Sequence, residues 1–516
     1  MKQSRISRST PRSPSAAAEA TVKQRAAIVR VAANRTRSCG RPHPACGSAR
    51  ADGGCRRVRS SASEGGCRVS SGQRCADGHA RRANTRGMGR VTLAVVLIVV
   101  ICTIGLSTAV WGVAALCRLA AEGRTGASLL SPSMFFRPEE VAVLIAAHDE
   151  QLVIADAVRA ARALVPARNV FVVSDGSNDE TAARAREAGA TAWDLVPNRG
   201  KAGAIRAGLA HFRIPERFPL LLLLDADSRP RPDYLRTGLP LFTDEGVVAV
   251  AGRATTAPDA ATRGMGRLLT SYRERTYVCT QYLHKFGQAA RATDAVAIVP
   301  GFASMYRTDV LDRIDIDAPG LSIEDFNMTF EVHAKRLGRI AFHPACAIAE
   351  TQDPALFRDY SAQMRRWSLG FWQTVRRHGP RRGLFWASVG VFAVETVVSS
   401  LVLTAMVPVL AVAAIAAAAS VMLAGEASTV ASAVATVLPV GPLAAAFLAA
   451  DAAMTVFSCA VTGTRPRVWM LLFPLLRVWD AVLCLRALVA AIGRGRPSDG
   501  RWRSPDRRAA LSPVSP

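Results

Sequence analysis

The sequence combines uncharged apolar runs of membrane-spanning length with one long stretch that has the composition of a water-soluble domain. The first run, residues 91–117, contains 27 residues and no charge. About 20 apolar residues suffice for a helix to cross the hydrocarbon core, so we expect a transmembrane helix over 91–117. The run is too long for a signal peptide, and no clear small-residue cleavage site ends it. The fold must therefore place a soluble domain beside membrane helices.

Three further apolar runs follow the soluble stretch. They cover residues 384–424, 429–461 and 468–492. Because prolines interrupt the first two, each is either one long span or a kinked pair. These prolines are Pro408, Pro439 and Pro442. The third run carries Arg477, Asp480 and Arg486, so it lies in the interface or lines a protein-filled cavity. We expect transmembrane or interfacial helices over 384–492.

The net charge of +25 is concentrated at the N-terminus. Residues 1–90 hold 20 Lys and Arg against 4 Asp and Glu, which leaves +9 for the other 426 residues. This stretch lacks periodicity and has too few large apolar side chains to offset the entropy of ordering. We expect a disordered basic tail over 1–90. Binding of nucleic acid or anionic lipid by this tail is the minor alternative, and we expect no nucleic-acid partner for the rest.

Arginine clusters at the ends of the apolar runs predict the orientation of the chain. They are Arg376, Arg377, Arg381 and Arg382, then Arg465 and Arg467, then Arg494, Arg496 and Arg501. By the positive-inside rule these clusters are cytoplasmic, so we expect a multi-pass plasma-membrane protein with a cytoplasmic soluble domain. A single span before that domain would force the +16 tail across the membrane, so we expect translation to begin near Met88. Residues 493–516 are expected to be a second disordered basic tail.

The soluble stretch, residues 137–383, has the pattern of an α/β domain. Apolar strand-like runs at 141–146, 170–173 and 219–224 alternate with helical patterns near 151–164, 179–188 and 202–212. The unbroken apolar runs indicate strands that are buried on both faces. A succession of this kind predicts a mostly parallel sheet. In such sheets ligands bind outside the carboxyl ends of the strands.

Acidic residues cluster at those expected strand ends. The three segments are His148-Asp149-Glu150, Asp175-Gly-Ser-Asn-Asp179 and Asp225-Ala-Asp227. Carboxylates at one edge of a sheet would repel one another without a cation or a donor-rich ligand. For Asp179, capping of the next helix is an equally good interpretation. Asp225 and Asp227 are better suited to a hard divalent ion that carries a diphosphate.

Three later segments also carry candidate chemistry, each with a plainer alternative. Asn198-Arg-Gly-Lys201 precedes a helix and offers a cation and free N–H groups to a phosphate, although a Gly-Lys helix start is common. Glu324-Asp325 precedes a helix near 326–337 and would also complement a helix dipole. The segment Gln363-Met-Arg-Arg366-Trp367 lies in a helical stretch that runs to about residue 378. Its plainer interpretation is an aromatic belt with snorkelling arginines.

Together these motifs resemble the membrane-integrated family-2 glycosyltransferases, which include cellulose, chitin, hyaluronan and poly-N-acetylglucosamine synthases. The likeness rests on Asp175 in a DGS segment, Asp225-Ala-Asp227, Glu324-Asp325, and Q-x-x-R-W at Gln363, Arg366 and Trp367. It covers roughly residues 137–383 and the flanking spans. The resemblance implies a GT-A-type, Rossmann-like domain with a mostly parallel sheet, inserted between transmembrane helices. It also implies a metal-dependent hexosyltransferase that takes sugar from a UDP-sugar with inversion.

The resemblance also implies a role for each matching residue. Asp175 would contact the uracil, Asp149 and Glu150 would line the same pocket, and Lys201 would lie near the uridine and diphosphate. Asp225 and Asp227 would hold Mg2+ or Mn2+, with Asp227 the more direct ligand. Asp325 would be the general base, and Glu324, Gln363, Arg366 and Trp367 would hold the diphosphate and the acceptor end. The chain departs from the family at Asp149, where Asn is frequent, and at Ile323, where Thr or Ser is.

These roles are chemically consistent with inverting transfer. An acceptor hydroxyl must attack the anomeric carbon opposite the leaving UDP, and a carboxylate within reach can take its proton. A metal and an arginine stabilise the leaving diphosphate. We expect a processive synthase of a β-linked polysaccharide, with N-acetylglucosamine as the first candidate sugar, and with the membrane helices guiding export. The alternatives are transfer of one sugar to a lipid carrier or glycolipid, and a non-catalytic membrane scaffold or transporter.

Overall fold

The computed structural model describes residues 97–125, 136–257, 263–422 and 440–493, and the single positions 93, 425 and 429. The tails expected over 1–90 and beyond 493, and the expected start near Met88, lie outside the described residues. The chain divides into two units, residues 1–91 with 461–464, and the remainder. All contacts described below lie within the second unit.

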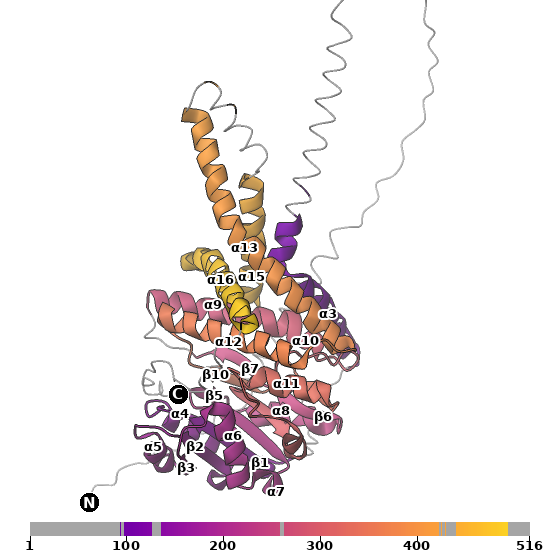
Figure 1. Cartoon of the computed structure of the whole chain (residues 1–516). Helices are drawn as coiled ribbons and strands as arrows, with labels where there is room; N and C mark the ends of the chain where they lie inside the picture. Colours follow the sequence, from indigo (N-terminus) through magenta and orange to yellow (C-terminus); the bar gives the residue numbers. More distant parts are fainter. Residues whose placement is uncertain are drawn as a thin grey trace, which may run out of the picture. The chain divides into compact units, whose positions relative to one another are not determined.

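A seven-stranded, mostly parallel sheet forms the centre of the soluble domain (Figure 1). Its strand order is β3-β2-β1-β4-β8-β6-β9. The strands are β1 (Val141–Ala147), β2 (Val170–Asp175), β3 (Thr191–Leu195), β4 (Leu220–Asp225), β6 (Val247–Ala251), β8 (Ala303–Arg307) and β9 (Arg339–Ala341). β1 pairs in parallel with β2 and β4, whereas β8 runs antiparallel to β4 and β6. The expected α/β fold with a mostly parallel sheet is confirmed.

The apolar runs in β1 and β4 are buried on both faces of the sheet. Leu144 and Leu223 pack into one core cluster, while Ile145 and Leu222 pack into a second cluster on the opposite face. Successive side chains of a strand point to opposite faces, so a strand covered on both sides needs an apolar residue at every position. The sequence of these strands therefore reflects their central place in the sheet.

Helices cover both faces. α6 (Gly200–His211) contributes Ile205 to the first cluster, and α4 (Ile154–Arg162) contributes Val158 to the second. A Cβ at Gly208 would lie 2.7 Å from Val173 Cγ2, so glycine allows α6 to approach the sheet closely. The other helices of the domain are α5 (Thr181–Glu187), α7 (Ile214–Arg217), α8 (Tyr234–Gly238), α10 (Phe286–Gln288) and α11 (Asp325–Ala334).

Two longer helices and a small sheet complete the domain. The small sheet has the order β5-β10-β7, with β5 (Ser228–Pro230), β7 (Arg253–Thr256) and β10 (Ile348–Thr351). The helices are α9 (Met265–Cys279) and α12 (Phe357–His378). Figure 1 shows both between the large sheet and the apolar C-terminal helices. Tyr272 of α9 and Tyr360 of α12 pack in one buried cluster with Phe473 of the C-terminal apolar helices.

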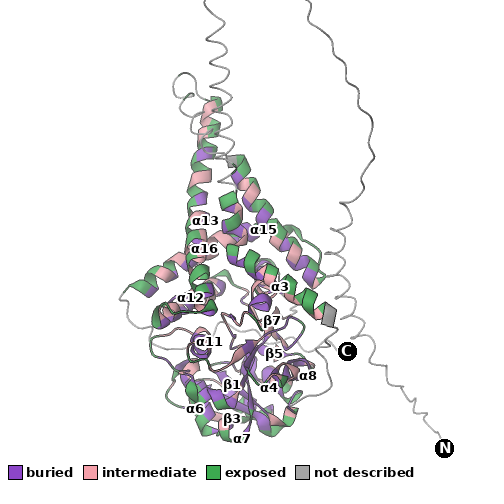
Figure 2. Ribbon diagram, turned by 90° about the vertical axis from the view of Figure 1, so that its right-hand side faces the viewer, coloured by how far each residue is buried: buried purple, intermediate pink, exposed green. Residues whose placement is uncertain are grey.

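Among the residues that the structure describes, three helices are long and apolar enough to cross a membrane, or up to four if one bent pair is a single span. They are α13 (Leu384–Met422), α15 (Val440–Thr462), of which Gly441–Thr462 qualifies, and the segment Val468–Ile492, which includes α16 (Phe473–Ile492). Figure 2 shows α13 and α15 largely exposed, in contrast to the buried strands. Apolar helices exposed in this way are suited to contact lipid.

The first two expected spans differ in whether their helix is continuous. The helix expected over 91–117 is a pair, Leu97–Ile104 and Leu106–Gly123, bent by 63°. The break falls at Gly105, whose φ of +96° suits glycine, and a Cβ there would overlap the Glu395 carboxylate. Within 384–424, by contrast, α13 continues as one helix through Pro408. At 39 residues it extends about 58 Å, longer than a hydrocarbon core.

Candidate active site

The carboxyl end of β4 carries the first part of the candidate active site. Asp225 is the last residue of β4, and Lys201 lies in the first turn of α6. Lys201 Nζ is 2.8 Å from Asp225 Oδ1 and 2.8 Å from Glu324 Oε1. The structure thus joins three segments that the sequence predicted separately. Three carboxylates, those of Asp225, Glu324 and Asp325, act on the charge of this one lysine and raise its pKa despite its burial.

Asp325 is the first residue of α11 and lies directly beside this ion pair. Burial raises the pKa of its carboxyl to about 8, and the neighbouring Glu324 carboxylate adds to the rise, while Lys201 opposes it. Burial alone would raise the pKa of Glu324, but Lys201 holds it below its usual value. Glu324 therefore stays ionised, whereas Asp325 accepts a proton near neutral pH. That is the property a general base requires.

Gly301, which the sequence did not reveal as a site residue, fixes the position of Asp325. Its backbone N–H donates to the Asp325 carboxylate. A Cβ at this position would overlap Asp325 Oδ1 and lie 3.1 Å from Lys201 Nζ. Only glycine lets the backbone approach both side chains so closely. Glycines in turns are too common for the sequence to have identified Gly301 as a site residue in advance.

A second buried lysine, also not predicted, lies within electrostatic reach of Asp325. Lys285 ends the π-helical turn Thr280–Lys285, and its Nζ is 5.4 Å from the centre of the Phe342 ring. Burial lowers its pKa to about 7, and the charge of Asp325 opposes that fall. Single-turn π-helical segments often mark functional sites. A lone lysine in the sequence carried no such signal.

At the end of β2, Asp175 forms a separate, buried acceptor. Its Oδ1 accepts the Arg199 N–H at 2.8 Å, and its backbone oxygen accepts from Asn198 Nδ2 at 2.9 Å. Its Oδ2 is buried and has no hydrogen-bond partner in the part of the chain that the structure describes. Burial raises the pKa of this carboxyl, and the N–H groups of Arg199 and Gly200 oppose the rise. One oxygen is therefore available to a ligand N–H.

Asp149 and Glu150 contact the loop that follows β2. Asp149 has φ of +51°. Its Oδ1 accepts the Asn178 N–H at 2.7 Å, and its own N–H donates to Ser177 Oγ at 3.2 Å. Glu150 is buried, and its N–H donates to Thr181 Oγ1 at 2.8 Å. These contacts shape the loop around Asp175, so the predicted place of both residues beside the nucleotide stays a prediction.

Asp179, for which the sequence allowed either capping or binding, makes local hydrogen bonds. Its Oδ1 accepts the Thr181 N–H at 2.9 Å at the start of α5, and its Oδ2 accepts the Gln151 N–H at 3.1 Å. Both acceptor oxygens thus serve the ends of neighbouring segments. The capping interpretation is the one that the contacts favour.

α12 presents the Q-x-x-R-W residues on the side that faces the Asp325 loop. A Cβ at Gly370 would overlap the Ile323 side chain, so α12 touches the segment just before Glu324 and Asp325. Gln363, Arg366 and Trp367 lie seven, four and three residues before Gly370, which places them on the same helix face. Gln363 Oε1 and Arg366 Nε are buried without hydrogen-bond partners among the described residues. Such atoms are suited to a polar ligand.

An ion-pair cluster that the sequence did not predict supports Trp367. The Arg273 guanidinium lies 4.2 Å from the centre of the Trp367 ring. Arg273 Nε also pairs with Asp353 Oδ1 at 3.1 Å, and Tyr277 Oη donates to the same oxygen at 3.0 Å. Arg273 and Asp353 are almost fully buried. Arg273 and Tyr277 lie on α9, whereas Asp353 lies 80 residues after Arg273, so no local pattern pointed to this cluster.

The carboxylates of Asp225 and Asp227 fit a divalent cation by their chemistry. Asp225 ends β4 and Asp227 follows it by two residues, both are partly exposed, and Ser228 Oγ donates to Asp227 Oδ1 at 3.3 Å. No group of three His, Cys, Asp or Glu side chains able to hold a metal occurs in the described parts of the chain. A cation bound by these two aspartates would therefore take its remaining ligands from a diphosphate or from water.

Comparison with known proteins agrees with this geometry. Residues 138–370 match the family described as "Glycosyltransferase like family 2". The matched range contains β1, the strand-end carboxylates, Asp325 and the Q-x-x-R-W segment. The chain therefore contains a family-2 glycosyltransferase domain with a GT-A-type fold, and the protein is a glycosyltransferase. No curated protein matches the chain.

Several solved structures are similar to parts of this chain at low sequence identity. A mannosyltransferase from Pyrobaculum calidifontis, in complex with GDP-Man and Mn2+, is 17% identical, with 71% of this chain and 98% of that chain covered and a TM-score of 0.41. Mannosyl-3-phosphoglycerate synthase from Rubrobacter xylanophilus is 20% identical, with 47% and 76% covered and a TM-score of 0.32. Glucosyl-3-phosphoglycerate synthase from Mycobacterium tuberculosis, in complex with Mn2+, UDP-glucose and phosphoglyceric acid, is 16% identical, with 46% and 79% covered and a TM-score of 0.31.

Proposed function

We propose that this glycosyltransferase is an inverting membrane enzyme that adds a sugar from a UDP-sugar to a growing β-linked polysaccharide. N-acetylglucosamine is the first candidate sugar. The observation that carries the proposal is the convergence of Lys201, Asp225, Glu324 and Asp325 at one edge of the sheet. This cluster lies beside α12, the helix that carries Gln363, Arg366 and Trp367. Apolar helices of spanning length pack on α12.

In the proposed reaction Asp325 accepts the proton of the acceptor hydroxyl. The hydroxyl oxygen forms a bond to the anomeric carbon of the donor sugar as the bond from that carbon to the UDP oxygen breaks. The sugar inverts its configuration, the proton ends on Asp325, and UDP leaves with the bonding electron pair. Glu324 keeps the pKa of Asp325 high, and Gly301 holds the carboxylate in place. Together they prepare the base for this step.

The leaving diphosphate needs positive charge around it. Lys201 supplies one cation at the sheet edge, and Arg366 on α12 supplies a planar guanidinium suited to phosphate oxygens. Asp225 and Asp227 would hold Mg2+ or Mn2+, which supplies Lewis-acid stabilisation of the diphosphate when it is bound.

The uracil end of the donor would bind at Asp175. Its Oδ2, which has no hydrogen-bond partner among the described residues, can accept the imino N–H of the base. Its other oxygen is held by the Arg199 N–H, so the carboxylate has a fixed orientation. The Asn198-Arg-Gly-Lys201 segment therefore links the proposed base pocket to the cation at the diphosphate.

Processive polymer synthesis is favoured over transfer of one sugar by the intact Q-x-x-R-W segment and by the helices around it. Trp367 offers a flat apolar surface to a sugar ring and is held by Arg273. Apolar helices packed on α12 would give a growing chain a route from the site across the membrane from the cytoplasmic side. The second candidate, transfer to a lipid carrier or glycolipid, uses the same residues and differs only in the acceptor.

The test is UDP release by membranes that contain the full chain, assayed with a panel of UDP-sugars and with Mg2+, Mn2+ or a chelator. We expect metal-dependent release with one UDP-sugar, and none with Asp325→Asn. A ladder of product lengths is expected for a polymerase. A single lipid-soluble product would replace the polymer proposal by the second candidate. Failure of both release and UDP-sugar binding would contradict the catalytic assignment and favour a scaffold or transporter.

A further inference from the structure

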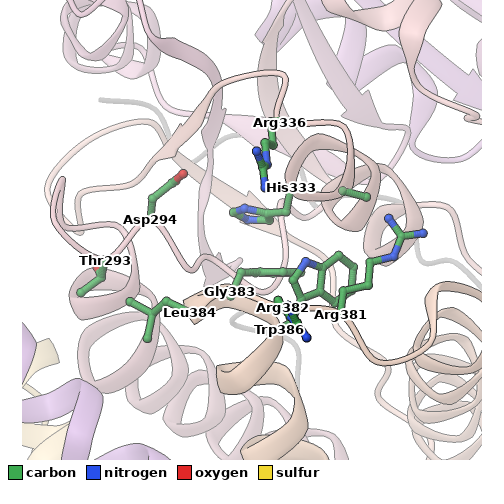
Figure 3. Close-up of a pocket in the computed structure, with 11 residues that line it drawn as sticks. Thr293, Asp294, His333, Arg336, Arg381, Arg382, Gly383, Leu384 and Trp386 are labelled. Atoms are coloured by element: carbon green, nitrogen blue, oxygen red, sulfur yellow. The ribbon is translucent and has the colours of Figure 1, made fainter.

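A hollow of about 470 Å³ lies where α13 leaves the soluble domain. Its lining includes Arg336, Arg381, Arg382, Phe385 and Trp386. Figure 3 shows Arg336 and His333 on one side and Trp386 with Arg381 on the other. None of these residues belongs to the active site described above. The hollow is therefore a separate feature with its own chemistry.

The walls of the hollow are held in place by aromatic packing. The His333 ring stacks on Phe385 with 3.8 Å between ring centres and 18° between planes. Phe330 packs edge-on against Phe385 at 5.1 Å. Arg381 Nε donates to the His378 backbone oxygen at 3.1 Å, and its guanidinium lies 5.2 Å from the centre of the Trp386 ring. The hollow thus has a built aromatic floor with a fixed cation at its edge.

The lining carries unbalanced positive charge. The side chains of Arg336 and Arg382 are exposed and form no ion pair with any residue that the structure describes. Asp294 is the single acidic member of the lining and lies toward the other end of the hollow, where its Oδ1 accepts the Ile340 N–H at 3.3 Å. Burial lowers the pKa of His333, so this ring is neutral at pH 7. Three guanidinium groups therefore face one carboxylate.

The position of the hollow beside the start of α13 indicates which kind of ligand it binds. Arg381 and Arg382 directly precede Leu384, where a helix of membrane-spanning character begins. In a membrane crossed by α13, lipid phosphates would lie near these arginines, and Trp residues are enriched at this boundary. Guanidinium groups bind phosphate oxygens in a bidentate manner. Basic pockets beside membrane helices are suited to anionic lipid headgroups.

We propose that this hollow binds the phosphate of an anionic membrane lipid, with Arg336 and Arg382 as its main cationic contacts and Phe385 and Trp386 beside its glycerol region. A soluble phosphate compound would bind the arginines in the same way but has no apolar part to contact the exposed apolar start of α13. The two sources of phosphate are therefore separable by experiment.

The hollow also lies at the far ends of the two helices that carry the proposed chemistry. α11 begins at Asp325 and ends at Ala334, which lines the hollow. α12 carries Trp367 and ends at His378, whose ring centre lies 5.9 Å from that of Trp386, a lining residue of the hollow. A bound headgroup would hold both helix ends against α13. The binding proposal itself does not rest on the proposed function.

The test measures lipid binding directly, on the purified full chain in neutral detergent. Native mass spectrometry would follow the first lipid adduct during titration with phosphatidylglycerol or with phosphatidylcholine. We expect a clear preference for phosphatidylglycerol. Arg336→Gln and Arg382→Gln should each weaken its binding roughly fivefold, the equivalent of about 1 kcal/mol for each cation near an anionic headgroup. Arg336→Lys, which keeps the charge, should lose less.

Arg168→Gln is the matched control, because Arg168 is an exposed arginine that precedes β2 at the opposite edge of the sheet. It should bind phosphatidylglycerol as the unchanged protein does. Equal phosphatidylglycerol binding by the Arg336→Gln/Arg382→Gln double variant would overturn the proposal. Inorganic pyrophosphate is the soluble probe. If it occupied the hollow while phosphatidylglycerol showed no preference over phosphatidylcholine, a soluble ligand would replace the lipid.

Discussion

The active-site cluster and a second buried group of charged side chains are balanced differently. In the active-site cluster, Lys201 pairs with Asp225 and Glu324, while Asp325 adds a third carboxyl without a cation of its own. The second group joins α9 to the apolar helices. There Arg275 Nη1 lies 2.7 Å from Asp451 Oδ2, and Arg477 Nη1 lies 3.6 Å from the other Asp451 oxygen.

The second group also satisfies its remaining carboxylate. The hydroxyls of Tyr272 and Tyr360 donate to Asp480 at 2.9 and 2.7 Å. Arg477 and Asp480 of the last apolar run therefore face protein, as expected for a cavity-lining helix, whereas Arg486 is exposed. A buried group that neutralises itself stabilises the packing of helices. A buried group with excess carboxylate, as at Asp325, is incomplete until a ligand or a proton arrives.

The largest expected effect on the incomplete group is that of Asp325→Asn. The amide cannot take the acceptor proton, so we expect the transfer rate to fall about 10⁴-fold. UDP-sugar binding should persist, because Asp175 and Lys201 are unchanged. Asp309→Asn, an exposed aspartate in the helical turn Thr308–Arg313, is the control. Normal turnover by Asp325→Asn would remove this residue from the base role.

For the balanced group, Asp451→Asn should reduce stability and not chemistry. The change leaves the buried Arg275 and the partly exposed Arg477 without their carboxylate, and we expect a loss of about 3 kcal/mol in the free energy of unfolding. Denaturation in detergent would measure it. The transfer rate per folded molecule should stay close to that of the unchanged protein. If Asp451→Asn kept full stability but lost activity, the balanced group would serve the chemistry, and the proposed difference between it and the active-site cluster would be wrong.

Gly301→Ala tests how closely the incomplete group is positioned. The added methyl would overlap Asp325 Oδ1, so the carboxylate must move. A displacement of about 1 Å at a catalytic group lowers the rate about 100-fold. Gly390→Ala is the matched control, since a Cβ there meets nothing within 4 Å. Thermal unfolding would check that both variants fold. Equal transfer rates for Gly301→Ala and Gly390→Ala would contradict the close contact between Gly301 and the Asp325 carboxylate.

The pH dependence of transfer provides a further test of Asp325. A pKa of about 8 means that the basic carboxylate becomes abundant only as the pH rises through that value. We expect kcat/KM to fall about tenfold for each pH unit below it. Because the folded protein binds this proton more tightly than the unfolded chain, the same group favours folding less as the pH rises from about 4 to about 8. A flat rate profile across this range would exclude the assignment.

The smallest expected effect is that of Arg273→Lys. Lysine keeps the charge but lacks the planar group that stacks on Trp367 and pairs with Asp353. The lost stacking is equivalent to about 1 kcal/mol, so we expect the acceptor KM to rise roughly fivefold while kcat changes little. Arg267→Lys on the same helix is the control, because Arg267 lies 5.3 Å from Trp469 instead. A fall in kcat without a change in the acceptor KM would show that Arg273 acts in the chemical step and not in acceptor binding.

Much of the fold was predictable because the central strands are recognisable from their unbroken apolar runs. The run Leu220–Asp225 is apolar at every position except its end, which indicates both burial on two faces and the edge where a ligand binds. The motif order also predicted Asp225, Glu324 and Asp325 as site residues. Gly301, Lys285, Arg273 and Asp353 were not predicted, because each has its role only through contacts with distant segments.

The sequence by itself determined the alternation of apolar spans and soluble domain, the parallel sheet and the acidic strand ends, since local periodicity and charge decide these. Only the tertiary structure decided which charges meet. It pairs Lys201 with Glu324 across more than a hundred residues, breaks the first apolar run at Gly105, and places three arginines around the hollow at α13. The physical reason is that the environment of a charge depends on packing between segments, which no stretch of sequence contains alone.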